Sequence, residues 1–142
     1  MRKREKMLLA VLCISAFLLS GCSRLFHYDP SNPNCRVVTG IEVHFENGPI
    51  KLHRFYTASE KMQKILNYFR LIDPYGVPEE DPETVEGSSF RITLSYSDGC
   101  KKTYLQKSDR FLMTDGQPWQ KINPKRAQEL SQIIGTLESD TA

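Results

Sequence analysis

The stretch RVVTGIEVHFE alternates apolar or small residues with polar ones, which is the pattern of a β-strand with one buried face. The alternating positions are Val37, Thr39, Ile41, Val43 and Phe45. Asn47-Gly48 then signals a hairpin, but Pro49 has no N–H group to close a two-residue turn there. The pattern therefore predicts a four-residue loop from Glu46, which places Ile50 opposite Phe45 on a second strand.

Two segments carry apolar residues at the spacing of an amphipathic helix. The first follows Thr57 and Glu60, which fit a capping box, and it stops at Asp73-Pro74. The second begins at Asn123-Pro124, a capping residue followed by proline at the first helical position, and Gly135 offers an earlier end. The predicted apolar stripes are Met62, Ile65, Leu66, Phe69 and Ile72 in the first helix, and Ala127, Leu130, Ile133, Ile134 and Leu137 in the second.

Residues 88–116 predict a three-stranded meander, because Phe90, Ile92, Leu94 and Tyr96 alternate with polar residues. Asp98-Gly99 favours a two-residue turn that pairs Ile92 with Leu105. A second such turn at Ser108-Asp109 pairs Leu105 with Leu112. Both registers place apolar residues on one face, and the segment QPWQKI adds a short strand or an irregular edge.

The same registers predict an aromatic and apolar patch on the opposite face of the sheet, since side chains alternate with a period of two. The residues predicted to point outward are Arg91, Thr93, Tyr104, Gln106, Phe111 and Met113. We interpret Arg91, Tyr104, Phe111 and Met113 as an interaction patch. The alternative is that the chain's own acidic loop, residues 73–87, or its N-terminal tether, residues 22–35, covers them.

The element order is therefore ββαβββα, and the predicted fold class is α+β, a mainly antiparallel sheet with both helices packed on one face. Between the first helix and the meander, residues 73–87 hold three prolines, two glycines and a cluster of acids. We expect no secondary structure there. Loops of this length are uncommon inside a compact domain and are often functional or disordered.

The N-terminal segment has the pattern of a bacterial lipoprotein signal peptide. Four basic residues precede an uncharged apolar run, Met7 to Leu19, which is shorter than the roughly 20 residues that span a bilayer. Leu19-Ser20-Gly21-Cys22 then fits a lipobox, which implies cleavage before Cys22 and a lipid on its sulfur. We therefore expect a signal peptide at 1–21, a lipidated N-terminus and flexible tether at 22–35, and one globular domain at 36–142.

Processing would change the charge balance. The full chain has 19 Lys and Arg against 17 Asp and Glu, and residues 1–21 hold four of the basic residues and one of the acids. The remaining 15 basic and 16 acidic residues give a net charge of −1, so a nucleic-acid partner loses its electrostatic support. The expected location is outside the cell, on the outer leaflet of the cell membrane.

The cysteines and histidines are the first candidates for further chemistry. Cys35 and Cys100 are the thiols left after processing, and export permits a disulfide between them. His27 lies in the tether, whereas His44 and His53 fall on neighbouring strands but do not pair in the predicted register. Since neither has a ligand at a metal-site spacing, we expect no metal and no cofactor beyond the covalent lipid.

The acids of residues 79–86 lack the spacing of a calcium loop, so we interpret them as a solvated loop, with docking of a basic partner as the alternative. No motif for a nucleophile or a nucleotide is present. We therefore predict no catalytic residues and no enzymatic activity, and a small hydrolase is the weakest of the alternatives.

Three segments resemble a group of small uncharacterised lipoproteins of Clostridia-type gut bacteria. They are KMQKILNYFRLIDPYGVPEEDPETVEGSSFRITLSYSDG, YLQKSDRF and DGQPWQKINP. The resemblance covers most of the mature chain and implies a Gram-positive envelope, although the lipobox alone also allows a Gram-negative host. It implies no activity and no site residues.

Taken together, these features predict a membrane-anchored, non-enzymatic surface module that binds a protein, peptide or glycan of the envelope. The alternative is an accessory or sensing subunit of an envelope transporter or signalling complex.

Overall fold

The computed structural model describes residues 37–140. Its elements are β1 (Val38–Asn47), β2 (Ile50–Tyr56), α2 (Ser59–Leu71), the 3₁₀ turn η1 (Pro82–Thr84), β3 (Ser89–Tyr96), β4 (Lys101–Lys107), β5 (Phe111–Thr114), β6 (Gln120–Lys121) and α3 (Pro124–Thr136).

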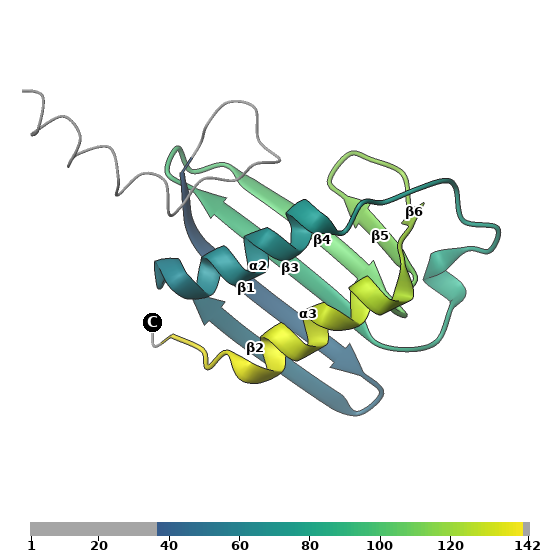
Figure 1. The fold of residues 1–142 in the computed structure, drawn as a ribbon, viewed down its shortest axis with the longest axis horizontal. Helices are drawn as coiled ribbons and strands as arrows, with labels where there is room; N and C mark the ends of the chain where they lie inside the picture. The colour runs from purple at the N-terminus through teal and green to yellow at the C-terminus, as the bar shows by residue number, and fades with distance from the viewer. Residues whose placement is uncertain (1–36, 141–142) are drawn as a thin grey trace, which may run out of the picture.

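The strands form one antiparallel sheet in the order β2-β1-β3-β4-β5-β6. Both helices lie across the same face of that sheet and leave the other face without a helix (Figure 1). The predicted α+β class and the order ββαβββα are confirmed, with β6 as the short extra strand. Among residues 37–140, no helix has the length and apolar character needed to cross a membrane.

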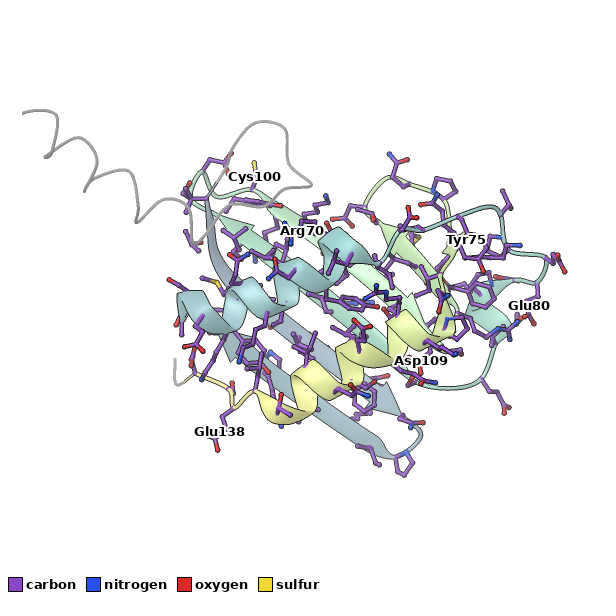
Figure 2. All side chains as sticks on the ribbon, viewed as in Figure 1. Arg70, Tyr75, Glu80, Cys100, Asp109 and Glu138 are labelled. Atoms are coloured by element: carbon purple, nitrogen blue, oxygen red, sulfur yellow. The ribbon has the colours of Figure 1, made fainter. Side chains whose placement is uncertain are left out.

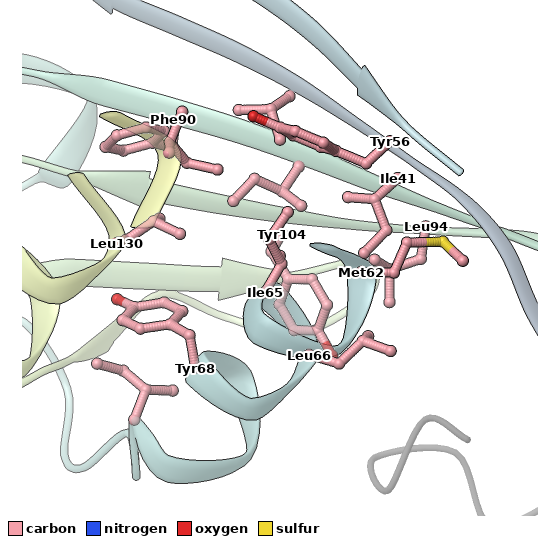
Figure 3. Close-up of a cluster of buried hydrophobic side chains, with 14 of the residues drawn as sticks. Ile41, Tyr56, Met62, Ile65, Leu66, Tyr68, Phe90, Leu94, Tyr104 and Leu130 are labelled. Atoms are coloured by element: carbon pink, nitrogen blue, oxygen red, sulfur yellow. The ribbon is translucent and has the colours of Figure 1, made fainter. Parts of the chain in front are cut away.

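The hydrophobic core fills the space between the helices and the inner face of the sheet (Figure 3). Alternate residues of β1 and β3 enter it, as predicted for Ile41, Val43, Phe90, Ile92 and Leu94. From α2 it receives Met62, Ile65, Leu66 and Tyr68, and from α3 it receives Ala127, Leu130 and Ile134.

The predicted loop between β1 and β2 is wrong by one pair of residues. Asn47 pairs with Ile50 and Phe45 pairs with Leu52, so the turn consists of Gly48-Pro49 alone. Gly48 adopts a φ of +57°, which suits the first central position of a tight hairpin turn. In that turn the closing N–H belongs to Ile50, and the missing N–H of proline is therefore no obstacle.

The predicted registers of β3–β4 and β4–β5 are wrong by one residue each. Ile92 pairs with Tyr104 instead of Leu105, and Leu112 pairs with Gln106. The N–H of Tyr96 donates to the Cys100 carbonyl at 2.9 Å, so the first loop has three residues between this pair and ends in Gly99 with a φ of +84°. The second loop has three residues between Lys107 and Phe111, and two were expected in each. A slip of one residue moves every side chain of a strand to the other face, so Tyr104 and Gln106 lie in the core and Leu105 faces outward.

Tyr104 and Gln106 are thus core residues and not members of an outer patch. Tyr104 is 5% exposed, and its ring stacks on that of Phe69 with the centroids 4.0 Å apart. Gln106 is buried and accepts a hydrogen bond from the Tyr68 hydroxyl, while its amide donates to the Ala127 carbonyl at 3.2 Å. Burial raises the pKa of Tyr68. These bonds let a polar side chain lie in the core without the cost of an unpaired group.

The predicted capping box at the start of α2 is not formed. The N-cap residue is Ala58, and no side chain of the helix caps it. Instead, the Asp140 carboxylate accepts hydrogen bonds from the backbone N–H groups of Thr57 and Ala58, each at 2.8 Å, and it pairs with Lys61. The bond from Lys61, followed by the two backbone donors, holds the pKa of Asp140 well below its usual range.

Helix α3 begins as predicted, because the Asn123 side chain accepts hydrogen bonds from the N–H groups of Lys125 and Arg126. The carbonyl groups at its C-terminal end accept hydrogen bonds from an arginine on the inner face of β2. Arg54 donates to the carbonyls of Ile134 and Leu137, which satisfies acceptors that a helix end leaves open.

Candidate functional site

The outer, helix-free face of the sheet carries a continuous row of side chains across five strands. His53, His44, Arg91, Leu105 and Met113 are successive direct partners from β2 to β5. Direct partners in an antiparallel pair place their side chains on the same face. The register of the sheet therefore brings together residues that are far apart in the sequence.

At the β2 side of this row, Glu42, His44 and His53 form a close cluster. Glu42 and His44 are two residues apart on β1 and so share a face, and His53 lies directly opposite His44. The two imidazole rings stack with centroids 4.2 Å apart and planes 11° from parallel. Both Nε2 atoms approach the Glu42 Oε1 atom, at 3.1 Å from His44 and 2.7 Å from His53.

The cluster is open to solvent, since both histidine side chains are exposed and that of Glu42 is 38% exposed. The hydrogen bond from His53 lowers the pKa of Glu42, partial burial opposes this shift, and His44 adds to the lowering. Two imidazole nitrogens and one carboxylate oxygen form a donor set that suits zinc and neighbouring divalent metals.

Sequence reasoning missed this cluster because the predicted β1–β2 loop was two residues too long. In that register His44 and His53 did not pair, whereas in the structure they are direct partners. A signal was present in Gly48-Pro49, which fits the centre of a two-residue turn. Placing the turn there brings the two histidines opposite each other.

Next to the cluster, the same face is hollowed. The hollow has a volume of about 410 Å³, and its lining includes His44, Glu46, Glu83, Ser89, Arg91, Leu105, Lys107 and Trp119. His44 therefore belongs to the rim of the hollow and to the cluster. Among the residues that the structure describes, the Arg91 guanidinium makes no hydrogen bond or ion pair, and it is exposed to solvent.

The acidic loop borders the hollow and is tied to the turn between β4 and β5. Lys107 donates to the Glu83 carbonyl at 2.9 Å, Ser108 donates to the Glu86 carbonyl at 2.6 Å, and Arg110 pairs with the Glu80 carboxylate. The expectation of no secondary structure in residues 73–87 is wrong at two points, because η1 forms with Asp81 as its cap and Tyr75 forms an antiparallel bridge with Lys121.

These ties explain what happens to the predicted interaction patch. Arg91 does face outward. Phe111 lies on the outer face of β5, opposite Lys107, but it is only 2% exposed, and the acidic loop is fastened to its sequence neighbours Ser108 and Arg110. Met113 lies on the outer face and is half-buried. The outer face therefore has no exposed patch of Tyr104 and Phe111, and it carries the hollow with its charged and polar lining.

The predicted cysteine sites divide between described and undescribed residues. Cys22, Cys35 and His27 lie outside the described residues. Cys100 is exposed beside the β3–β4 turn, at the end of the molecule away from Glu80 (Figure 2), and it forms no disulfide with another residue of 37–140. The Val37 carbonyl accepts a hydrogen bond from the N–H of Ser97 at 2.9 Å, so the described chain starts at the same end of the sheet as Cys100. The bridge to Cys35 stays a prediction.

No known protein family, curated protein or solved structure matches this chain.

Proposed function

We propose that this protein is an exported, lipid-anchored and non-enzymatic binding module whose ligand lies in the hollow of the helix-free face. The observation that carries the proposal is a concave surface that is lined by charged, polar and apolar side chains. Binding pockets are typically concave, with a few polar groups that fix the ligand's orientation.

The lining favours a ligand that carries both an anionic group and a flat or apolar part. Arg91 is free to bind a carboxylate or phosphate in a bidentate way. Lys107 adds a second positive charge, but Glu46 and Glu83 also line the hollow and oppose an anion, so the anionic group is expected at Arg91. Trp119 and Leu105 offer apolar surface beside them. An anionic peptide or glycan segment of the envelope has this chemistry.

The proposal of binding without catalysis is supported by how the histidines are used. Their Nε2 atoms both approach the Glu42 carboxylate and not a hydroxyl or thiol, whereas a nucleophilic enzyme needs such a group beside its base.

The ligand site is tested by photo-crosslinking in intact cells. A benzoylphenylalanine at Leu105 lies in the hollow, and the same group at Gln132, exposed on α3, serves as the matched control. We expect an added mass on the chain only from the Leu105 position, whether the adduct is a protein, peptide or glycan. Arg91→Ala and Trp119→Ala in that background should reduce the adduct. An equal yield from Gln132, or none from Leu105, would refute the proposal.

The anchor is tested separately by mass spectrometry of the mature chain. We expect a lipid on Cys22 as the first residue, and we expect Cys22→Ser to leave the chain uncleaved and without lipid. A mature chain that starts elsewhere would contradict the anchor but would leave the hollow untouched as a binding site.

A further inference from the structure

We propose that Glu42, His44 and His53 together bind one divalent transition-metal ion, with zinc as the probe. The ligands would be the Nε2 atoms of the two histidines and a carboxylate oxygen of Glu42. This inference does not rest on the proposed ligand of the hollow, because it needs only these three side chains.

The spacing of the three donor atoms fits a metal ion. Ligand atoms at about 2.0–2.1 Å from a zinc ion lie roughly 2.9–3.4 Å from one another in octahedral or tetrahedral shells. The Nε2 atoms of His44 and His53 lie 3.1 and 2.7 Å from Glu42 Oε1, so these two separations are close to that range. One ligand atom from each of the three residues lies within 4.8 Å of the other two. A bound ion would require the exposed side chains to rotate until all three separations fall in that range.

The backbone holds these side chains in place before an ion arrives. β1 is paired on both sides, to β2 and to β3, and the three residues lie on the regular part of that ladder. Sites built on strands are held more precisely than sites built on loops. The three ligands come together because Glu42 and His44 are two residues apart on β1 and His53 lies directly opposite His44 on β2.

The surroundings set both the open coordination positions and the strength of binding. Because the cluster is exposed, water completes the shell, as in metal sites with three protein ligands. One carboxylate and two neutral imidazoles leave a bound divalent ion with a net positive charge. Arg91, opposite His44 on β3, opposes that charge, so we expect moderate affinity. Lys51 opposes it less, since it pairs with Glu46 at 3.5 Å.

The test is calorimetric titration of Zn²⁺ into the purified full chain in detergent, with all thiols alkylated beforehand. The cluster variants are His44→Ala, His53→Ala and Glu42→Gln. The matched controls are His27→Ala, which removes the third histidine, and Glu79→Gln, which removes an exposed carboxylate of the loop 73–87. Urea midpoints check that every variant is folded.

We expect one equivalent of zinc to bind to the wild type and to both controls with affinities that agree within about twofold. Each cluster variant should bind at least about tenfold more weakly, in line with the loss of part of a metal site. In the wild type, NMR signals of the His44 and His53 rings should shift together as zinc is added. No binding at millimolar zinc, equal affinity in the cluster variants, or loss of binding in His27→Ala would overturn the proposal.

Discussion

Replacing Tyr104 by alanine tests the register of the β3–β4 hairpin, because the side chain lies in the core only if the connecting loop has three residues. A buried aromatic residue removes about 150–250 Å² from water. At about 25 cal/mol per Å² this is worth roughly 4–6 kcal/mol as an upper bound. Measured losses for large aromatic residues in cores are about 3–5 kcal/mol. Since Tyr104 is 5% exposed and stacks on Phe69, we expect Tyr104→Ala to cost about 4 kcal/mol of unfolding free energy.

Leu105 is the internal control, because it is the neighbouring residue on the opposite face and is half-buried. Its truncation to alanine should cost about 1 kcal/mol, a fraction of the value for a fully buried leucine. With a urea slope of about 1.5 kcal/mol per molar, the midpoint should fall by about 2.7 M for Tyr104→Ala and by about 0.7 M for Leu105→Ala.

The comparison refutes the reasoning if Leu105→Ala lowers the midpoint as much as Tyr104→Ala, or more. That result would restore the two-residue turn at Asp98-Gly99, which points Tyr104 outward. Where Tyr104→Ala proves too unstable to purify, Tyr104→Leu keeps most of the volume, and the ranking against Leu105→Ala still decides the register.

Two further predictions follow from single contacts, and a third concerns the two cysteines. Gln106→Leu leaves the buried Tyr68 hydroxyl without its partner and should lower the free energy of unfolding by about 1–3 kcal/mol in urea melts. If adding Tyr68→Phe recovers none of that stability, the contact is not the cause. Asp140 has a lowered pKa in the folded chain, so it stabilises the fold above its unfolded pKa of about 4, and this contribution is lost as the pH falls below that value. Asp140→Asn should therefore show a flatter acid limb than the wild type in thermal melts, and parallel acid limbs would contradict the assigned contact. For Cys35 and Cys100, thiol titration of the unreduced, denatured chain decides whether the bridge that export permits is formed: a bridge leaves neither thiol free, and two free thiols reject it.

The sequence predicted the elements well where one face of a segment is uniformly apolar. In β3 the side chains of Ile92 and Leu94 enter the core as expected. The predicted helical stripes are buried except for Phe69 and Ile133, which are partly buried. The strand β4 has no such clear face, because Tyr104 and Leu105 are neighbours and both could be buried. The loop length then decides, and the Asp98-Gly99 dipeptide is compatible with loops of two or three residues.

The prediction of the candidate site also depended on the length of one loop. A two-residue error in the loop before β2 kept all faces correct but separated His44 from His53. The cluster of Glu42, His44 and His53 was therefore missed, although Gly48-Pro49 offered a signal for the shorter turn. Gln106 shows a different limit. A glutamine on a strand favours an outward position by polarity alone, and only the tertiary contacts to Tyr68 and Ala127 explain why it is buried.

Residues 139 and 140 cover part of an edge of the sheet. The strand β2 is an edge strand, and unpaired N–H and C=O groups on an edge are templates for pairing with another chain. At Phe55 these groups are taken, because its N–H donates to Ser139 at 2.9 Å and its carbonyl accepts from the N–H of Asp140 at 2.8 Å. A chain cut after Glu138 would free this part of the edge and would tend to aggregate through β2. A protein produced for experiments should therefore keep this segment and carry any tag beyond it.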